Sequence, residues 1–270
     1  TLNATNSNIV INGDIDIFSG GTLIAPGENQ TFTVSGNWTN NGNFHANGGT
    51  ITFDGEGTQN ITSGEFSFYN LDIVNTSEDT VYLQDDLDVD DVLTIEATTT
   101  LFLNGYNLYV GNNLRNYGTL VLTFTGITAD DKTYDGDTTA TLDTTEASLV
   151  EKVVIGGVTV ELNKEAIGNF KDANADTEKT VTVSGLSTNL DIGKCIFEPL
   201  ADVFANINKA DLTVTGINAA NKVYDGATDA MLYGTAVLNG VVDAEDVTLD
   251  TAGATGTFAD SSVGVGKTVT

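Results

Sequence analysis

Short apolar runs alternate with polar residues along the first half of the chain, and Gly or Asn separates one run from the next. Alternation with a period of two is typical of β-strands with one buried face. The pattern predicts strands over residues 9–17, 22–24, 31–38, 50–53, 66–74, 80–93 and 101–110. The best helical candidate, residues 146–154, is too short to change an all-β prediction.

These strand-and-turn units recur roughly every 20–27 residues up to about residue 120. Such a repeat is typical of a β-solenoid, in which inward Ile, Val, Leu and Phe stack from rung to rung. Asn side chains at the corners are expected to form hydrogen-bonded ladders between rungs. The sequence therefore predicts a right-handed β-solenoid over residues 1–119. An antiparallel sandwich with Asn-Gly turns is the alternative for this half.

A longer repeat occupies the second half. The Tyr-Asp-Gly triplet at residues 134–136 returns at residues 224–226, a separation of 90 residues. The Lys-Thr-Val-Thr segment at residues 179–182 returns at residues 267–270, a separation of 88. A period of this length suits an Ig-like β-sandwich module rather than a solenoid rung. The second half is thus predicted to contain tandem Ig-like modules.

We place module 1 at residues 120–210 and module 2, an incomplete copy, at residues 211–270. Module 2 has no counterpart of the last strands expected in module 1, around residues 196–206. An unfinished sandwich leaves an open sheet edge. We therefore expect module 2 to be marginally stable or completed by a partner, and the chain to be part of a longer protein.

Composition argues against several classes of partner. The 270 residues include 38 Asp and Glu against 10 Lys and Arg, a formal net charge of -28. This negative charge argues against nucleic-acid binding through a basic surface. Membrane insertion is not expected either, because no apolar run approaches the ~18 residues of a membrane span. The single Cys195 allows no intramolecular disulfide and no thiolate zinc cluster, and we expect it to be a small buried apolar residue.

The segments around the two Tyr-Asp-Gly triplets, with residues 208–214 before the second, resemble the YDG-type and related Ig-like repeats of very large bacterial surface proteins. Upstream, residues 36–44, 49–55 and 68–73 resemble the β-helical regions of secreted Bacteroidota proteins and filamentous-haemagglutinin-like adhesins.

This resemblance implies an exported protein, either extracellular or attached to the outer membrane at the cell surface, and a type IX secretion cargo in a Bacteroidota host. It also implies a role in cell adhesion or biofilms as an adhesin, stalk or filament component. The implied partners are further domains of the same polypeptide, glycans and neighbouring surface proteins.

One acidic cluster is a candidate site for Ca²⁺, which binds oxygen ligands. Within a strand, alternate aspartates share one face, so their repulsion would favour either a bound cation or full solvent exposure. The spacing is not that of an EF-hand loop. A solvated acidic face is the alternative to calcium. The cluster consists of Asp85, Asp86, Asp88, Asp90 and Asp91.

A second acidic cluster lies at the expected junction of the solenoid and module 1, where a cation would stiffen the joint. It consists of Asp130, Asp131, Asp135 and Asp137. In the second copy only the aspartate of the triplet recurs, as Asp225. This favours a turn in which Tyr packs inward, Asp bonds the backbone and Gly adopts a special dihedral angle.

No catalytic site is predicted. Two carboxylates suffice for a glycosidase, but acidic pairs are too plentiful here to single one out. A lyase would use Lys or Arg, yet Arg115 is the only basic residue before Lys132. His45 is the only histidine, and we expect it in a rung or a corner.

The sequence favours a non-catalytic structural or adhesive stalk segment. One alternative is a glycan-binding or glycan-degrading β-helix protein that carries its modules as spacers. Its cleft would be lined by aromatic residues such as Trp38, Phe44, Tyr69 and Tyr82. The other alternative is a self-assembling filament subunit, in which a strand from a neighbouring chain fills module 2.

Overall fold

The computed structural model describes residues 1–75, 79–242 and 245–270, and in these ranges the chain forms strands, turns and loops without a helix. The all-β prediction is confirmed. The helical candidate, residues 146–154, instead contains part of a turn, β21 (Ser148–Leu149) and the start of β22 (Val153–Ile155). No helix in the described ranges could cross a membrane.

The described chain divides into two compact units. Unit 1 comprises Thr1–Asp130, Ala140–Asn169 and Thr180–Phe204, and unit 2 comprises Asp131–Thr139, Phe170–Lys179 and Ala205–Thr270.

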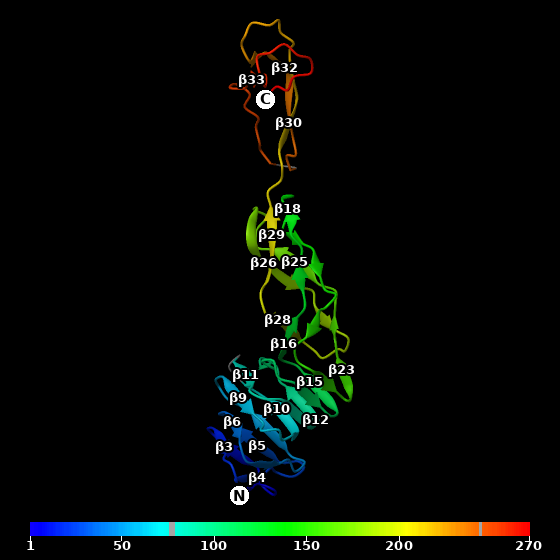
Figure 1. Cartoon of the computed structure of the whole chain (residues 1–270). Helices are drawn as coiled ribbons and strands as arrows, with labels where there is room; N and C mark the ends of the chain where they lie inside the picture. Colours follow the sequence, from blue (N-terminus) through cyan, green and yellow to red (C-terminus); the bar gives the residue numbers. More distant parts are fainter. Residues whose placement is uncertain (76–78, 243–244) are drawn as a thin grey trace. The chain divides into compact units, whose positions relative to one another are not determined.

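Parallel strands stack into the solenoid of unit 1 (Figure 1). The largest sheet runs in the order β2 (Ile9–Ile11), β5 (Thr31–Val34), β8 (Thr50–Phe53), β10 (Phe68–Ile73), β12 (Leu87–Ile95), β14 (Leu108–Val110), β22 (Val153–Ile155) and β23 (Val158–Val160), and β15 (Asn113–Asn116) also pairs with β12. Only the last pair on this path, β22 with β23, is antiparallel. Parallel pairing of successive rungs is the solenoid arrangement, so the antiparallel sandwich is wrong for this half.

A second large sheet forms another side of the rungs. It runs in the order β3 (Ile15–Ile17), β6 (Trp38–Asn40), β9 (Gln59–Thr62), β11 (Thr80–Leu83), β13 (Thr100–Phe102), β16 (Thr119–Thr125) and β21, and β28 (Cys195–Pro199) also pairs with β16. The first rungs have a third side made of β1 (Leu2–Asn3), β4 (Thr22–Ile24) and β7 (Asn43–His45).

Some predicted strands prove to be two strands joined at a corner. Residues 9–17 contain β2 and β3, with a bend at Gly13, and residues 31–38 end where β6 begins. The chain leaves one sheet and enters the next at these bends. Apolar residues continue to alternate on both sides of the bend, so the period alone did not locate it.

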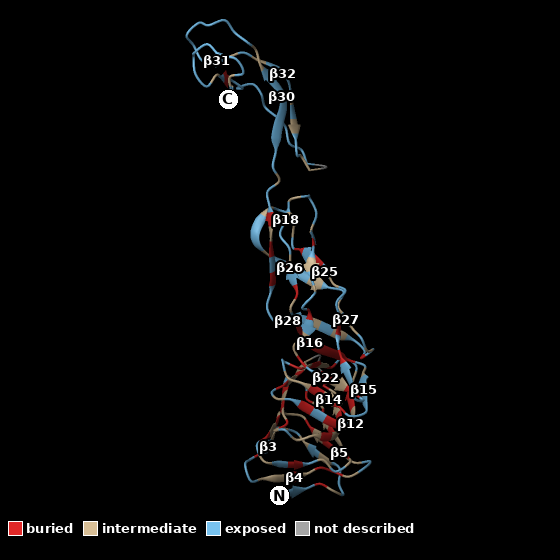
Figure 2. Cartoon of the chain, turned by 45° about the vertical axis from the view of Figure 1, so that its right-hand side comes forward, coloured by how far each residue is buried: buried red, intermediate tan, exposed pale blue. Residues whose placement is uncertain are grey.

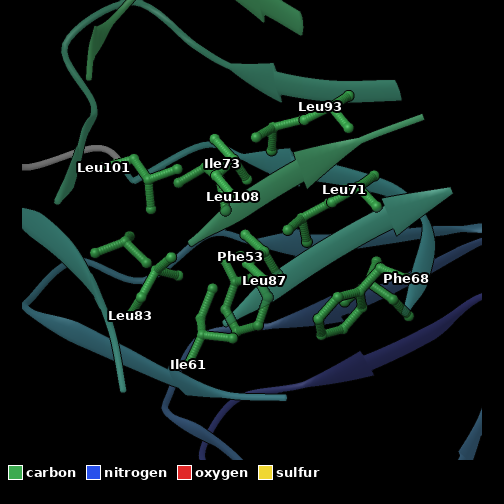
Figure 3. Close-up of a cluster of buried hydrophobic side chains, with 14 of the residues drawn as sticks. Phe53, Ile61, Phe68, Leu71, Ile73, Leu83, Leu87, Leu93, Leu101 and Leu108 are labelled. Carbon is green, nitrogen blue, oxygen red and sulfur yellow. The ribbon is translucent and has the colours of Figure 1, made fainter. Parts of the chain in front are cut away.

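Apolar side chains repeat in register along the largest sheet. Each rung presents one to the same column, at spacings of 23, 19, 20 and 22 residues. The column consists of Ile9, Phe32, Ile51, Leu71 and Leu93. Figure 3 shows side chains from the two sheets, among them Leu71, Leu83 and Phe53, meeting inside the rungs. A rung therefore buries its apolar face against its neighbours.

The aromatic residues proposed for a glycan cleft divide between interior and surface. Trp38 is fully buried and meets the rings of Phe44 and Phe68 at centroid distances of 5.1 and 5.4 Å. Trp38 and Phe44 are therefore wrong as a glycan platform, because both point into the core. Tyr69 and Tyr82 are half-buried.

The end of the solenoid is covered by later segments of the chain. β22 pairs in parallel with β14, and β28 pairs in parallel with β16. The carboxylate of Glu151, which is 3 % exposed, accepts the N–H of Thr123 over 2.9 Å and that of Gly105 over 3.2 Å. These bonds occupy edge groups that an uncovered last rung would leave open.

Smaller sheets contain the remaining strands of the described chain. A five-stranded sheet runs in the order β18 (Lys132–Thr133), β29 (Val203–Asn208), β26 (Asp176–Ser184), β25 (Ile167–Phe170) and β19 (Thr139–Ala140). Two-stranded sheets join β17 (Thr128–Ala129) to β20 (Leu142–Asp143), β24 (Leu162–Asn163) to β27 (Ser187–Thr188), β30 (Thr213–Ala219) to β32 (Leu232–Asn239) and β31 (Asp229–Ala230) to β33 (Gly256–Thr257).

Module 2 has almost no interior. Figure 2 shows β30 and β32 in the colours of exposed and intermediate residues, whereas buried residues gather in the solenoid sheets. Among the described residues of module 2, only Gly256 is buried. That module 2 is marginally stable or completed by a partner stays a prediction of the sequence.

We expect Leu71→Ala to lower the free energy of unfolding of the solenoid by about 2–5 kcal/mol, because Leu71 is fully buried and the change leaves a cavity between rungs. The only tryptophan, Trp38, lies in the same core, so its fluorescence during chemical denaturation reports this transition. Val10→Ala is the control, since Val10 is 64 % exposed, and it should cost less than about 0.5 kcal/mol. Equal losses in the two variants would contradict the inward stacking of Leu71.

Candidate functional site

Asparagine and aspartate side chains link successive rungs at one corner of the solenoid. Asn37 donates its backbone N–H and its Nδ2 to Asp14 Oδ1, over 2.7 and 3.1 Å. Asn60 makes the same two bonds to Asn37 Oδ1, over 2.8 and 3.1 Å. Gln84 Nε2 then donates to Asn60 Oδ1 over 2.8 Å. The predicted ladder between rungs is confirmed, and its first acceptor is a carboxylate.

The first candidate calcium cluster takes part in the same kind of bonding. Asp85 accepts the backbone N–H groups of Ser63 and Gly64 on the preceding rung, over 2.7 and 2.6 Å. Asp86 accepts from the backbone N and Nδ2 of Asn107 on the following rung, over 2.9 and 2.8 Å. These two carboxylates therefore join their own rung to the rungs on either side.

Other members of this cluster also bond neighbouring rungs. Asp90 accepts from Ser67 Oγ over 3.1 Å, and Asp91 accepts from Asn112 Nδ2 over 3.0 Å. Asp88 is exposed in β12, where partial desolvation and the nearby Asp90 raise the pKa of its carboxyl. The aspartates thus face different partners rather than one common point.

The second candidate cluster divides in a similar way. Asp131 accepts from the backbone N and Nδ2 of Asn206, over 2.7 and 2.8 Å, and these bonds lower the pKa of Asp131. Lys132 Nζ lies 2.7 Å from Asp135 and 2.9 Å from Asp137. Asp131 therefore holds β29, while the other two carboxylates neutralise a lysine.

Within the described residues, no three His, Cys, Asp or Glu side chains are grouped so as to hold a metal ion. Bound calcium and a solvated acidic face therefore remain the two alternatives that the sequence offers for these clusters.

The aspartates of the two triplets form matching turns. Asp135 accepts the N–H of Asp137 over 3.1 Å, and Asp225 accepts the N–H of Ala227 over 3.0 Å. The glycine after each aspartate has a φ of 84° in module 1 and 79° in module 2, a region that favours glycine. The predicted roles of Asp and Gly are confirmed.

The predicted inward packing of the triplet tyrosines is wrong. Tyr224 is 65 % exposed. Tyr134 is half-buried, and its hydroxyl donates to the carboxylate of Glu245. Tyr134 is held to the neighbouring strand through its backbone rather than through a buried ring, because its N–H donates to Asn208 O over 2.7 Å.

One lysine pairs with each triplet aspartate. Lys132 Nζ lies 2.7 Å from Asp135, and Lys222 Nζ lies 2.9 Å from Asp225. The two lysines are 90 residues apart, like the triplets themselves. The same ion pair therefore recurs in both modules.

A second lysine pair also recurs. Lys179 Nζ lies 2.7 Å from Asp172, and Lys267 pairs with Asp260 in the same way. Sequence reasoning did not assign these four lysines a role. The available signal was their recurrence in a chain with only ten basic residues.

These pairs hold two carboxyl groups strongly in their ionised form. Bonds from Lys132 and from Thr139 lower the pKa of Asp137 to about 2. Bonds from Lys267 and from a neighbouring serine lower the pKa of Asp260 to about 2. Each carboxylate closes a loop by accepting several donors, which is a structural role.

The remaining single residues fit structural roles as well. His45 lies exposed in β7, in register with Ile24 of the neighbouring rung, as expected for a rung residue. Cys195 is half-buried and packs against the solenoid core. Burial, together with the charge of Asp191, raises the pKa of its thiol to about 11, so the thiol is protonated at neutral pH.

The sequence model of the YDG domain matches residues 118–191 and 208–270, which is more than half of the chain. The chain belongs to the YDG domain family. Both matched segments contain a Tyr-Asp-Gly turn and its two lysine pairs, so modules 1 and 2 each carry the features of a YDG module. No curated protein and no solved structure matches the chain.

We expect Lys132→Met to raise the pKa of Asp137 from about 2 toward its ordinary value of 3.8, because the lysine is the main cause of the lowered value. Carboxyl ¹³C shifts followed by NMR during acid titration measure it. Because ionised Asp137 favours the folded turn, the turn should be fully stable above about pH 4 and weaken as pH falls toward 2. Lys152→Met removes the same charge near the ring of Tyr109 and should leave this titration unchanged.

We expect thermal melts of the chain in millimolar CaCl₂ and in MgCl₂ at equal ionic strength to agree within about 1 °C, because the clustered aspartates already accept hydrogen bonds within the fold. A rise specific to calcium would contradict this and favour ordered cation sites at the acidic clusters. A melt in EDTA provides the baseline.

Proposed function

We propose that the chain is a non-catalytic structural and adhesive stalk segment of an exported bacterial surface protein. The observation that carries this proposal is the use of the acidic side chains. Those at rung corners accept hydrogen bonds from neighbouring rungs, and those in the YDG modules pair with lysines. The carboxylates that accept these bonds are engaged in holding the fold, which supports a structural role for them.

Stacked rungs and repeated modules support a role in which length is the useful property. In a solenoid each rung contacts only its neighbours, so reach grows with the number of rungs. We infer a right-handed winding, as is general for parallel strands joined by crossovers. We also take each complete YDG module to be an Ig-like sandwich.

The proposed setting follows from the resemblance to large repetitive adhesins. The segment would lie outside the cell or be attached to the outer membrane, joined to further domains of the same polypeptide. In a Bacteroidota host it would be a type IX secretion cargo that acts in adhesion or biofilms. Glycans and neighbouring surface proteins are its proposed partners. The net charge of -28 keeps such a segment soluble and discourages binding to nucleic acids.

A self-assembling filament subunit is a second candidate function. It is favoured by the exposed apolar side chains of module 2, among them Val263 and Val265, which are 83 % and fully exposed. The glycan-degrading alternative has lost the support of Trp38 and Phe44, since both are buried.

We expect the full chain, immobilised and exposed to a panel of bacterial and host glycans, to retain some of them without cleaving any. Retention is measured with labelled glycans, and cleavage by the appearance of new reducing ends in the same wells. Heat-unfolded chain is the control for non-specific retention. New reducing ends would contradict the non-catalytic role.

A further inference from the structure

One row of side chains on the outer face of the second large solenoid sheet is apolar. Strand alternation sets its direction, because adjacent residues such as Leu83 and Leu101 point into the rungs (Figure 3). Consecutive members of the row are register partners on β11, β13, β16 and β28. This outer row consists of Tyr82, Phe102, Val121 and Ile196.

The members of the outer row pack against one another and reach the surface. The rings of Tyr82 and Phe102 meet edge to face, with their centroids 5.5 Å apart. Both rings are half-buried, and Ile196 is 44 % exposed. Val121 is only 6 % exposed, although it faces away from the solenoid core, because it lies in register between Phe102 and Ile196. The outer row is thus a continuous apolar stripe across four strands.

Uncharged hydrogen-bonding side chains border the outer row on both sides. Two residues before its members, Thr80, Thr100 and Thr119 are register partners of one another. Two residues after its aromatic members, Gln84 and Asn104 are exposed. Their amide nitrogens donate hydrogen bonds within the solenoid, which fixes both side chains in place. Hydroxyl and amide groups therefore flank an apolar stripe that is one side chain wide.

The face that carries the outer row is uncharged in a strongly acidic chain. From β6 to β16, the outward-pointing residues of the described strands are Thr, Asn, Tyr, Phe and Val. The outer face of the largest sheet differs, since it carries Asp72, Asp88 and Arg115. A chain with a net charge of -28 repels acidic ligands, so an uncharged ligand fits this face best.

The width of the outer row distinguishes between kinds of partner. Four strands spaced ~4.8 Å apart make the row about 14 Å long. A stable protein interface covers ~800 Å² on each partner, far more than one row of side chains provides. A second copy of the chain would also bring the same charge of -28 to the contact. A linear glycan matches the row better, because it is one sugar ring wide and each ring has an apolar CH face and hydroxyl edges.

We propose that the outer row is a binding surface for an uncharged linear glycan. Successive sugar rings would lay their CH faces on Tyr82 and Phe102, while their hydroxyl groups bond the flanking threonines and amides. Such binding would be insensitive to salt, because neither partner is charged at the contact. This inference rests on the adhesive role proposed for the chain and specifies the class of glycan and its site.

The test titrates neutral sugars into the full ¹⁵N-labelled chain. The probes are linear oligosaccharides of glucose, mannose, xylose and N-acetylglucosamine at millimolar concentration. We expect at least one of them to shift the amide signals of β11 and β13, with the same dissociation constant at low and at high ionic strength. An oligosaccharide of galacturonic acid should bind about ten-fold more weakly, because the chain repels its carboxylates.

Single substitutions locate the site. Tyr82→Ala should weaken binding about ten-fold, whereas Tyr82→Phe keeps the ring and should retain most of the affinity. Tyr109→Ala is the matched control, because Tyr109 is a half-buried ring on the outer face of the largest sheet, and it should leave the affinity unchanged. Trp38 fluorescence during chemical denaturation verifies that each variant keeps the solenoid folded.

Three results would overturn the proposal. The first is the absence of binding by every neutral probe, and the second is equal affinity of the Tyr82→Ala and unchanged chains. The third is the appearance of the same amide shifts when the chain concentration is raised without sugar, which would mean that a second copy covers the outer row.

The panel of bacterial and host glycans separates these failures from a failure of the proposed function. If the Tyr82→Ala chain retains glycans on that panel as well as the unchanged chain does, the adhesive role stands and its site lies elsewhere. If the unchanged chain retains no glycan at all, glycan adhesion is lost together with this site.

Discussion

Each rung of the solenoid can bury its apolar side chains only against the rungs next to it, and most of the structure follows from this constraint. It requires parallel strands in register, so that Phe32, Ile51 and Leu71 fall in one column. It also makes the last rung a weak point, since one side would face water. Two later strands cover the end of the solenoid, because β22 pairs with β14 and β28 pairs with β16. The buried carboxylate of Glu151 accepts two backbone N–H groups at the same end.

The acidic side chains also help to hold neighbouring rungs together. In a chain with a net charge of -28, carboxylates placed at random would repel one another and loosen the fold. Here an aspartate such as Asp86 is placed where Asn107 of the next rung presents two donors. In the YDG modules the scarce lysines, for example Lys132 and Lys179, lie beside carboxylates. These carboxylates therefore form local hydrogen bonds and ion pairs that stabilise the fold.

Much of this architecture could be read from the sequence, and the omissions have physical causes. Alternation identified the strands, and Gly and Asn identified the corners, because backbone preferences are local. Alternation could not say which residues around a corner point inward, so the glycan-cleft alternative placed Trp38 at the surface, whereas it lies in the core. The tyrosine of the triplet was expected inside, yet Tyr224 is exposed, because burial depends on strands distant in sequence. The lysine pairs join residues three to seven positions apart, and only their recurrence between modules could have revealed them.

The corner ladder that begins at Asp14 also limits how the length of this protein can change. Its bonds join residues 23, 23 and 24 positions apart, so donors and acceptors recur once per rung. One residue inserted within a strand would turn the following side chains of that strand to the opposite face. A duplicated rung, in contrast, brings its own acceptor and its own donors. Genes for such solenoids should therefore vary in length by whole rungs, and small insertions should accumulate at corners.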